Sequence, residues 1–114
     1  MVLDSKALDN LLNLLGGERE ALVELIDTFL GEAPQLLMKM RDAVNIGDAA
    51  TLRLTAHSLK SNGVDMGALT FADLCKQLEM LGRDGTVSGA SELLAQTEAE
   101  FQSVQSALIT FRDS

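Results

Sequence analysis

Residues 91–111 read SELLAQTEAEFQSVQSALITF, and the spacing of the core-compatible residues in this stretch decides the fold class. These residues recur at alternating intervals of three and four, as in a helix that buries one stripe in a bundle. We therefore predict a helix that begins near Ser88 or Ser91 and runs to about Phe111. Its seam consists of Leu94, Thr97, Phe101, Val104, Leu108 and Phe111.

The rest of the chain also carries apolar residues at helical spacing. We predict helices over about residues 5–15, 18–45, 48–66 and 68–81, and a loop over residues 82–85. Small polar residues and glycines stand where these helices would start or stop. The residues that act as such signals are Asp4 or Ser5, Gly16, Gly17, Gly47, Asp48 and Gly67.

Two positions interrupt the helical patterns and leave alternatives open. Pro34 lies inside the second predicted helix, so we expect a kink or a brief break over residues 31–34. In the third helix, Asn62-Gly63 could form a turn that ends the helix early. The apolar spacing through Val64 favours continuation instead, and close packing at Gly63 would then offset the cost of about 1 kcal/mol for an interior glycine.

The composition agrees with an all-helical chain. The 114 residues are 46% hydrophobic, include one proline and no tryptophan or tyrosine, and suffice for one domain with one core. Four long helices with short connections pack most simply as an antiparallel up-down four-helix bundle. We therefore predict an all-α fold, with the short extra N-terminal helix covering one end of the bundle.

The formal net charge of −8 disfavours binding to nucleic acid or to an anionic membrane surface. No apolar run is long enough to insert in a membrane, and the N-terminus lacks the pattern of a signal peptide. The one cysteine, Cys75, forms no intramolecular disulfide and is expected to be a small core residue. A cytoplasmic location is the simplest interpretation.

Residues 54–61 read LTAHSLKS and contain the only histidine, His57. One imidazole without a second ligand or base is a poor basis for a metal site or a catalytic triad, but it can carry a phosphoryl group. His57 lies beside the inner stripe of its helix, so we expect it at the bundle surface. The residues that share its face are Arg53, Lys60, Ser61 and Val64.

The partner of the imidazole should come from the next helix. The third and fourth helices form a hairpin that turns near Gly67, which places His57 opposite Gln77 and within one turn of Glu79. A carboxylate there could accept the Nδ1 proton and leave Nε2 free to attack phosphorus. Geometry at this level leaves both Glu79 and Gln77 as candidates. Ser61 is small enough to leave the imidazole open to a partner.

These residues resemble the histidine-containing phosphotransfer (HPt) domain family. The resemblance rests on His57-x-Leu59-Lys60-Ser61, on a glycine ten residues after the histidine, and on Glu79 twenty-two residues after it. Residues 29–34 and the Gly-Asp pair at 47–48 are similar to the family as well. Ser61 stands where glycine is frequent. By motif the resemblance covers roughly residues 18–82, and the remainder matches only by its helical pattern. We therefore expect one HPt-like domain over residues 1–114.

The resemblance implies a phosphorelay intermediate that takes a phosphoryl group on His57 from an aspartyl phosphate of a receiver domain and passes it to another receiver. Such a module is not an independent enzyme and holds no metal, nucleotide or other cofactor; the Mg²⁺ belongs to the receiver. Lys60, and Arg53 nearby, would then compensate charge on the phosphorylated imidazole. The expected partners are receiver domains, a hybrid sensor histidine kinase, or both.

Two other functions remain open. The chain could be the kinase-substrate domain of a chemotaxis-type histidine kinase, phosphorylated from ATP. It could also be a helical adaptor that is never phosphorylated. For the relay function we expect a monomer with an apolar docking patch around His57. The residues of that patch are Ser61, Val64 and parts of Leu11, Leu12 and Leu15.

Overall fold

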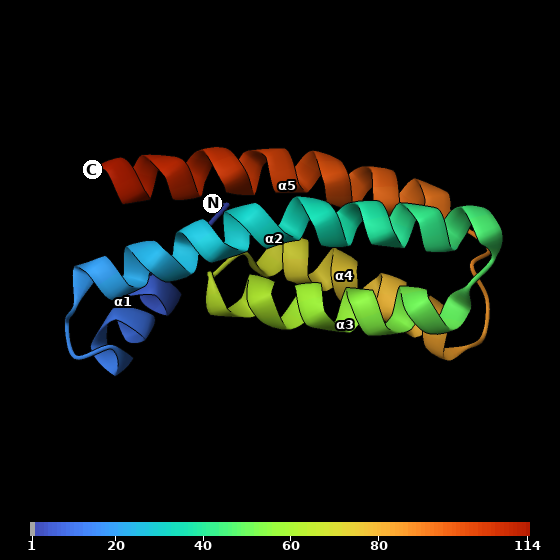
Figure 1. Cartoon of the computed structure of the whole chain (residues 1–114), viewed down its shortest axis with the longest axis horizontal. Helices are drawn as coiled ribbons and strands as arrows, with labels where there is room; N and C mark the ends of the chain where they lie inside the picture. Colours follow the sequence, from blue (N-terminus) through green and yellow to red (C-terminus); the bar gives the residue numbers. More distant parts are fainter. Residues whose placement is uncertain (1) are drawn as a thin grey trace.

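The computed structural model describes residues 2–114, which form a bundle of four long helices with a short helix at one end (Figure 1). The four long helices alternate in direction, and each follows its neighbour through a short connection (Figure 1). The predicted all-α, antiparallel up-down bundle with an extra N-terminal helix is confirmed. The helices are α1 (Ser5–Leu14), α2 (Arg19–Ile46), α3 (Ala49–Asp65), α4 (Leu69–Arg83) and α5 (Ala90–Asp113).

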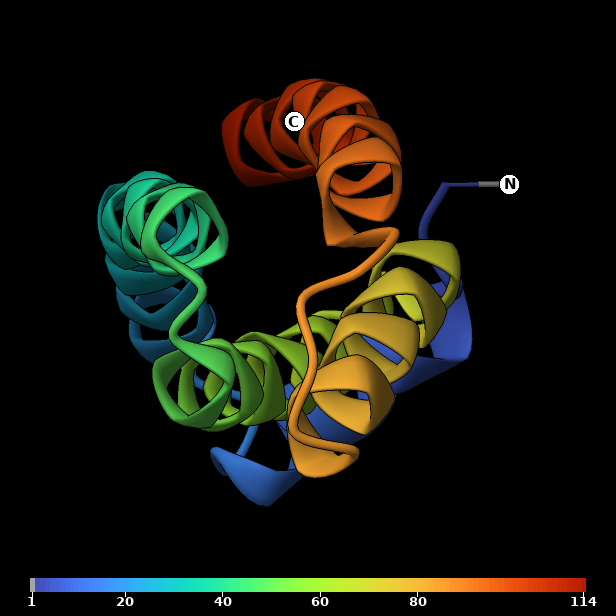
Figure 2. The same cartoon turned by 90° about the vertical axis from the view of Figure 1, so that its right-hand side faces the viewer.

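The core lies between the four long helices, which surround it when the bundle is viewed end-on (Figure 2). Phe29 of α2, Phe71 of α4 and Phe101 of α5 meet there with ring centroids 5.9–6.2 Å apart. Such aromatic contacts stabilise a core by about 0.5–1.5 kcal/mol per pair beyond the burial of area. The predicted α5 seam is buried from Leu94 to Leu108, and only Phe111 at its end is half-buried.

Helix α2 continues through Pro34 without a break, so the kink is the alternative that remains for residues 31–34. Ala33 and Leu37 are buried on either side of the proline, and their packing outweighs the loss of one backbone hydrogen bond. The proline ring is exposed, so it displaces no core side chain. The first turns of α2 slope relative to the rest of the helix (Figure 1), in agreement with the expected kink.

Two glycines allow α3 and α4 to pack closely. A Cβ atom on Gly63 would lie 3.1 Å from Cδ2 of Phe71 in α4, so only glycine leaves room for the facing helix. The close packing at this position offsets the cost of an interior glycine, and α3 continues through it. Gly82 was predicted to begin a loop, but it lies within α4 and is buried. A Cβ there would lie only 2.7 Å from the Ala49 carbonyl oxygen and 2.7 Å from the Arg53 backbone nitrogen. Contact with α3 therefore extends α4 to Arg83.

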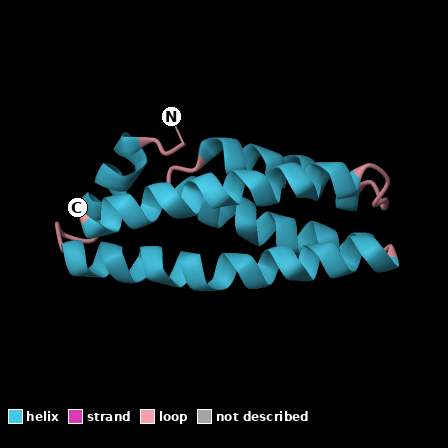
Figure 3. Cartoon of the chain, turned by 90° about the horizontal axis from the view of Figure 1, so that it is seen from above, coloured by secondary structure: helices cyan, strands magenta, loops and turns pink. Residues whose placement is uncertain are grey.

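The short helix α1 lies beside the turn between α3 and α4, at one end of the bundle (Figure 3). The Asp4 side chain accepts a hydrogen bond from the Lys6 backbone nitrogen and caps the helix, while the Asp4 N–H donates to the Gly67 carbonyl at 2.7 Å. Leu8 is buried beneath the helix. The prediction that this helix covers one end of the bundle is confirmed.

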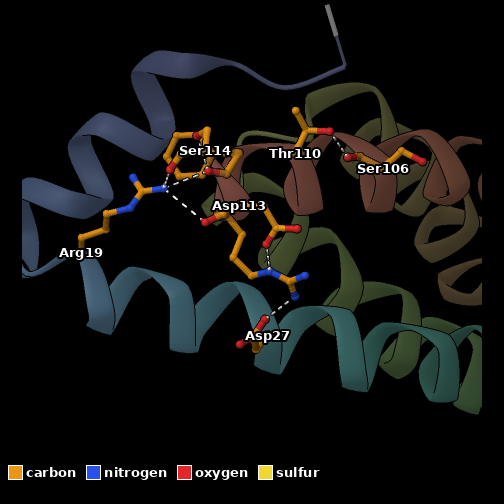
Figure 4. Close-up of polar contacts among 8 residues, drawn as sticks. Arg19, Asp27, Ser106, Thr110, Asp113 and Ser114 are labelled. Atoms are coloured by element: carbon orange, nitrogen blue, oxygen red, sulfur yellow. Dashed lines mark hydrogen bonds and ion pairs between the residues drawn. The ribbon is translucent and has the colours of Figure 1, made fainter.

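The start of α2 and the end of α5 are joined by arginine contacts (Figure 4). Arg19 Nη2 donates to the carbonyl oxygens of Phe111 and Ser114 at 2.9 and 3.1 Å, and its guanidinium lies 5.3 Å from the Phe111 ring centroid. Arg112 Nη1 lies 2.8 Å from Oδ1 of Asp27. These contacts close the ring of helices on the side where α5 meets α2.

None of the helices in residues 2–114 combines the length and the apolar character needed to cross a membrane. Cys75 is buried in the core, as expected, and burial raises the pKa of its thiol to about 12. The thiol is therefore protonated at neutral pH and packs as a small apolar side chain.

Candidate functional site

His57 lies near the middle of α3, on the side that faces solvent. Its neighbours Ala56 and Leu59 are fully buried and fix how the helix is rotated about its axis. That rotation brings the imidazole to the surface, where 60% of the side chain is exposed. The prediction that His57 lies at the flank of the bundle is confirmed.

One ring nitrogen of His57 is bound by a buried carboxylate. The Nδ1 atom lies 2.7 Å from Oε2 of Glu79 in α4, whose side chain is only 7% exposed. An ionised carboxylate only accepts hydrogen bonds, so Nδ1 carries the proton and donates it to Glu79. Nε2 forms no hydrogen bond with any residue between 2 and 114. Its lone pair is therefore free on an exposed ring.

Two cations contact the same carboxylate. Lys60 Nζ lies 2.5 Å from Oε1 of Glu79, on the oxygen that His57 does not use. Arg83 Nη2 lies 3.9 Å from Oε2, one helical turn after Glu79. Lys60 is therefore bound to the orienting carboxylate, and its ammonium lies on the Nδ1 side of the imidazole.

The charge on Glu79 follows from these contacts. Burial alone raises the pKa of this carboxyl group, but the hydrogen bonds from Lys60 and His57 and their charges lower it by more. The pKa of Glu79 therefore lies below its ordinary value, and the group is ionised at neutral pH. An ionised Glu79 can hold the proton on Nδ1 and stabilise a positive ring.

The choice between Glu79 and Gln77 is decided by helical phase. Two residues advance an α-helix by about 200°, so these two side chains point to opposite sides of α4. Gln77 is exposed, and its Nε2 donates to Oδ2 of Asp73 at 3.0 Å. The contact with His57 comes from Glu79 alone.

The other residues predicted to share the His57 face, Arg53 and Ser61, lie one turn before and one turn after the histidine. Both are exposed, and Arg53 forms no ion pair with another residue of the described chain. The Ser61 hydroxymethyl group is too short to cover the ring. The structure thus leaves the approach to Nε2 open on this side.

The predicted docking residues divide into two groups. Val64 is half exposed, two turns after His57 on the same face of α3. Leu11, Leu12 and Leu15 are half-buried and pack against the core, so only parts of these side chains are accessible. The exposed leucine of α1 is Leu14, which was not predicted, at 84% exposure.

Some features near His57 were not predicted as parts of the site. Arg83 is one, and its i, i+4 spacing from Glu79 was a signal for the contact. A groove between α3 and α4 is the other, lined in part by Leu69 and Lys76. Counting forward from the turn at Gly67 would place these α4 residues opposite Lys60 and Val64 of α3.

Metal ligands do not gather in this region. Over residues 2–114 there is no group of three or more histidine, cysteine, aspartate or glutamate side chains that could hold a metal ion. The side chains that meet around His57 are one carboxylate and two cations. This set is suited to orienting the imidazole.

Comparison with known proteins agrees with the geometry. The Hpt domain family matches residues 24–107. The crystal structure of histidine-containing phosphotransfer protein B (HptB) from Pseudomonas aeruginosa PAO1 superposes with a TM-score of 0.89 and 35% sequence identity, over 98% of this chain and 95% of that chain. No curated protein sequence matches this chain.

A second structure is similar in fold. The crystal structure of the HPT domain from a sensor hybrid histidine kinase of Shewanella gives a TM-score of 0.77 at 22% identity, over 96% of this chain and 92% of that chain. The family match covers most of the chain and includes both His57 and Glu79. The chain therefore belongs to the Hpt domain family, whose members carry phosphoryl groups on histidine in two-component phosphorelays.

Proposed function

We propose that this chain is a phosphorelay intermediate that accepts a phosphoryl group on Nε2 of His57 from the aspartyl phosphate of a receiver domain and passes it to another receiver. The observation that supports this proposal most directly is that the two ring nitrogens of His57 have different environments. Nδ1 is bound to a buried carboxylate at 2.7 Å, while Nε2 is free on a ring that is 60% exposed. A carrier needs a nucleophile that is oriented by its own protein and open to another.

The transfer is an in-line displacement at phosphorus. The Nε2 lone pair of neutral His57 forms the N–P bond as the P–O bond to the receiver aspartate breaks, and that electron pair stays on the aspartate carboxylate. The ring becomes positively charged, with its proton still on Nδ1. Glu79 accepts that proton in a hydrogen bond and stabilises the charge, as the carboxylate of a catalytic triad does for an imidazolium. The reverse sequence loads the next receiver.

Lys60 acts on this step through Glu79. Its ammonium at 2.5 Å neutralises part of the carboxylate charge and fixes the rotamer that reaches His57. Ser61 keeps the ring accessible. Arg53 of α3 and Arg83 of α4 are exposed cations, and we expect them to compensate the added phosphoryl charge. An exposed pair of this kind contributes about 0.2–1 kcal/mol.

The chemistry that this chain lacks comes from its partner. The receiver supplies Mg²⁺ and the acceptor or donor aspartate, while this chain holds neither metal nor cofactor and has no independent catalytic activity. The partners are receiver domains, free or within a hybrid sensor kinase. We expect the chain to act as a monomer, because a dimer through the α3–α4 face would cover His57.

A phosphotransfer profile tests this function. The chain is incubated separately with a panel of phosphorylated receiver domains and with ATP-loaded kinase domains, beside the His57→Gln variant. Labelling by a receiver that is lost in His57→Gln, with a phosphoryl group that is labile in acid and stable in base, is the expected result. Labelling only by a kinase domain would identify a kinase substrate domain instead. Full signalling output from His57→Gln would identify an adaptor.

A further inference from the structure

The nucleophile of this chain is complete without a second protein. Glu79 accepts the Nδ1 proton of His57 at 2.7 Å, so the tautomer with a free lone pair on Nε2 is already selected. Attack by Nε2 moves no proton, because the only ring N–H proton stays on Nδ1 throughout the step. The reaction therefore needs no general base, whichever molecule supplies the phosphoryl group.

The ring is also open to a small reactant. The side chain of His57 is 60% exposed, and the short side chain of Ser61 lies one turn after it on the same face of α3. A protein donor must be held by a surface of matching shape, but a small donor needs only room for an in-line approach to Nε2. The exposure of the ring gives that room.

The charge near His57 favours an anionic reactant more than the net charge of −8 suggests. Helices α3 and α4 contain four of the nine basic residues and three of the seventeen acidic residues, so the hairpin that bears His57 is slightly positive. Arg53, one turn before His57, is exposed and forms no ion pair with another residue between 2 and 114. A guanidinium that is free in this way attracts a phosphoryl dianion.

The leaving group decides which donors can react without help. When an acyl phosphate transfers its phosphoryl group, the P–O electron pair stays on a carboxylate, so negative charge develops at the departing oxygen. In the proposed relay the Mg²⁺ of the receiver offsets that charge. At His57 the nearest ammonium, that of Lys60, is bound to Glu79 on the Nδ1 side, and residues 2–114 contain no cluster of ligands for a metal ion.

A phosphoramidate, in which phosphorus is bound to nitrogen, has a leaving group of a different kind. Its zwitterion carries an ammonium group on a phosphoryl dianion, and the N–P electron pair leaves on nitrogen as neutral ammonia. No negative charge develops on the departing atom, and no proton has to be delivered to it. The Nε2 side of His57, where no residue between 2 and 114 forms a hydrogen bond with the ring, suits such a donor.

We propose that this chain also takes a phosphoryl group on Nε2 of His57 directly from small phosphoramidates, without a receiver domain and without Mg²⁺. The lone pair of Nε2 forms the new N–P bond as the N–P bond of the donor breaks, and ammonia leaves with that electron pair. The product is a phosphorylated, positively charged ring whose proton remains on Nδ1, where Glu79 stabilises it. The inference deepens the proposed function, on whose nucleophile it rests, by adding a class of donor.

Intact-mass spectrometry of the full chain, incubated with potassium phosphoramidate in the presence of EDTA, tests this inference. The expected result is one added phosphoryl group that is absent in His57→Gln. Two-dimensional ¹H–¹⁵N NMR of the imidazole should place this group on Nε2. Acetyl phosphate, a small acyl phosphate, should leave the chain unlabelled under the same conditions. Equal labelling by the two donors, or a phosphoryl group on Nδ1, would overturn the inference.

The matched control moves the histidine by one position, in the double variant His57→Gln, Ser58→His. Ser58 is exposed, and one residue turns an α-helix by about 100°, so the new imidazole does not face Glu79. The wild-type chain should react about tenfold faster than this variant, because only His57 is oriented by a hydrogen bond to a charged group. Equal rates would show the ordinary reactivity of an exposed histidine and would contradict the inference.

Thermal melting of each variant checks that the bundle is intact. Labelling by phosphorylated receiver domains is measured separately. A chain that reacts with receivers but not with phosphoramidate refutes this inference alone, and the opposite result refutes the relay function alone.

Discussion

Replacing Glu79 separates two contributions of this residue to phosphoryl transfer, its hydrogen bond and its charge. In Glu79→Leu the Nδ1 proton of His57 loses its acceptor at 2.7 Å, and Lys60 loses its counter-ion at 2.5 Å. In Glu79→Gln an amide oxygen can still accept the Nδ1 proton, but the negative charge is gone. The two variants should therefore slow transfer by different amounts.

The magnitudes follow from the strength of the contact. Hydrogen bonds to charged groups contribute about 1.5–3 kcal/mol, and neutral ones about 0.5–1.5 kcal/mol. If the carboxylate acts fully on the positive ring of the transition state, its loss in Glu79→Leu slows transfer about 10- to 150-fold. Glu79→Gln keeps about half of that interaction and should slow transfer only about fivefold.

Single-turnover transfer from a phosphorylated receiver, followed by rapid quench, measures these rates. Nitrogen-15 NMR of the imidazole reports independently where the proton lies, and the wild-type ring should carry it on Nδ1. The expected order of rates is wild type, then Glu79→Gln, then Glu79→Leu. The reasoning fails if Glu79→Leu transfers at the wild-type rate while its proton remains on Nδ1, or if Glu79→Gln is the slower variant.

Three other predictions concern the fold that holds the site. The pKa of Glu79 is lowered in the folded chain, so its interactions stabilise the fold above the ordinary pKa of 4.5. This stabilisation is lost as the pH falls through the pKa of the folded chain. Between about pH 5 and 3 the melting temperature of Glu79→Gln should therefore fall less than that of the wild-type chain. Gly82→Ala should destabilise the chain by about 1–3 kcal/mol in urea unfolding and also slow transfer, because the new Cβ pushes α3 from α4. Gly85→Ala has no neighbour to displace, so it should lose stability only through its positive φ of 78° and leave transfer unchanged. Arg19→Ala should lower stability by about 1 kcal/mol or less, since its contacts are exposed, without changing the transfer rate.

Most of the fold was predictable because helical periodicity is a local property. The α5 seam could be read from residue spacing alone, and Leu94 through Leu108 are buried as that spacing requires. The spacing is less informative where packing against other helices decides the outcome. Gly82 indicates a loop by its own propensity, but it lies inside α4 because α3 leaves no room for a side chain. Pro34 stays helical because Ala33 and Leu37 pack against the core beside it.

The site was predictable to the level of one helical turn. Counting from the turn at Gly67 places Gln77 and Glu79 opposite His57, but the count does not include the rotation of α4 about its axis. That rotation is set by the core residues Cys75 and Leu78, which bury one side of the helix and turn Glu79 toward α3. The direction of a long flexible side chain such as Lys60 depends on the nearest charge, which is known only once the helices are packed.

The distance between α3 and α4 therefore determines which ring nitrogen of His57 carries the proton. A glutamate side chain has a short reach, so Glu79 can be buried and still bond Nδ1 only if the two helices lie close together. Gly63 and Gly82 provide that closeness on either side of the site, because a Cβ on either one would lie within 3.1 Å of an atom of the facing helix. Along the hairpin, His57 lies between these two glycines, and the buried carboxylate of Glu79 accepts the hydrogen bond from its Nδ1. Any change that widens the hairpin should thus break the hydrogen bond between Nδ1 and Glu79 before it exposes the core, and transfer should slow while the bundle remains folded.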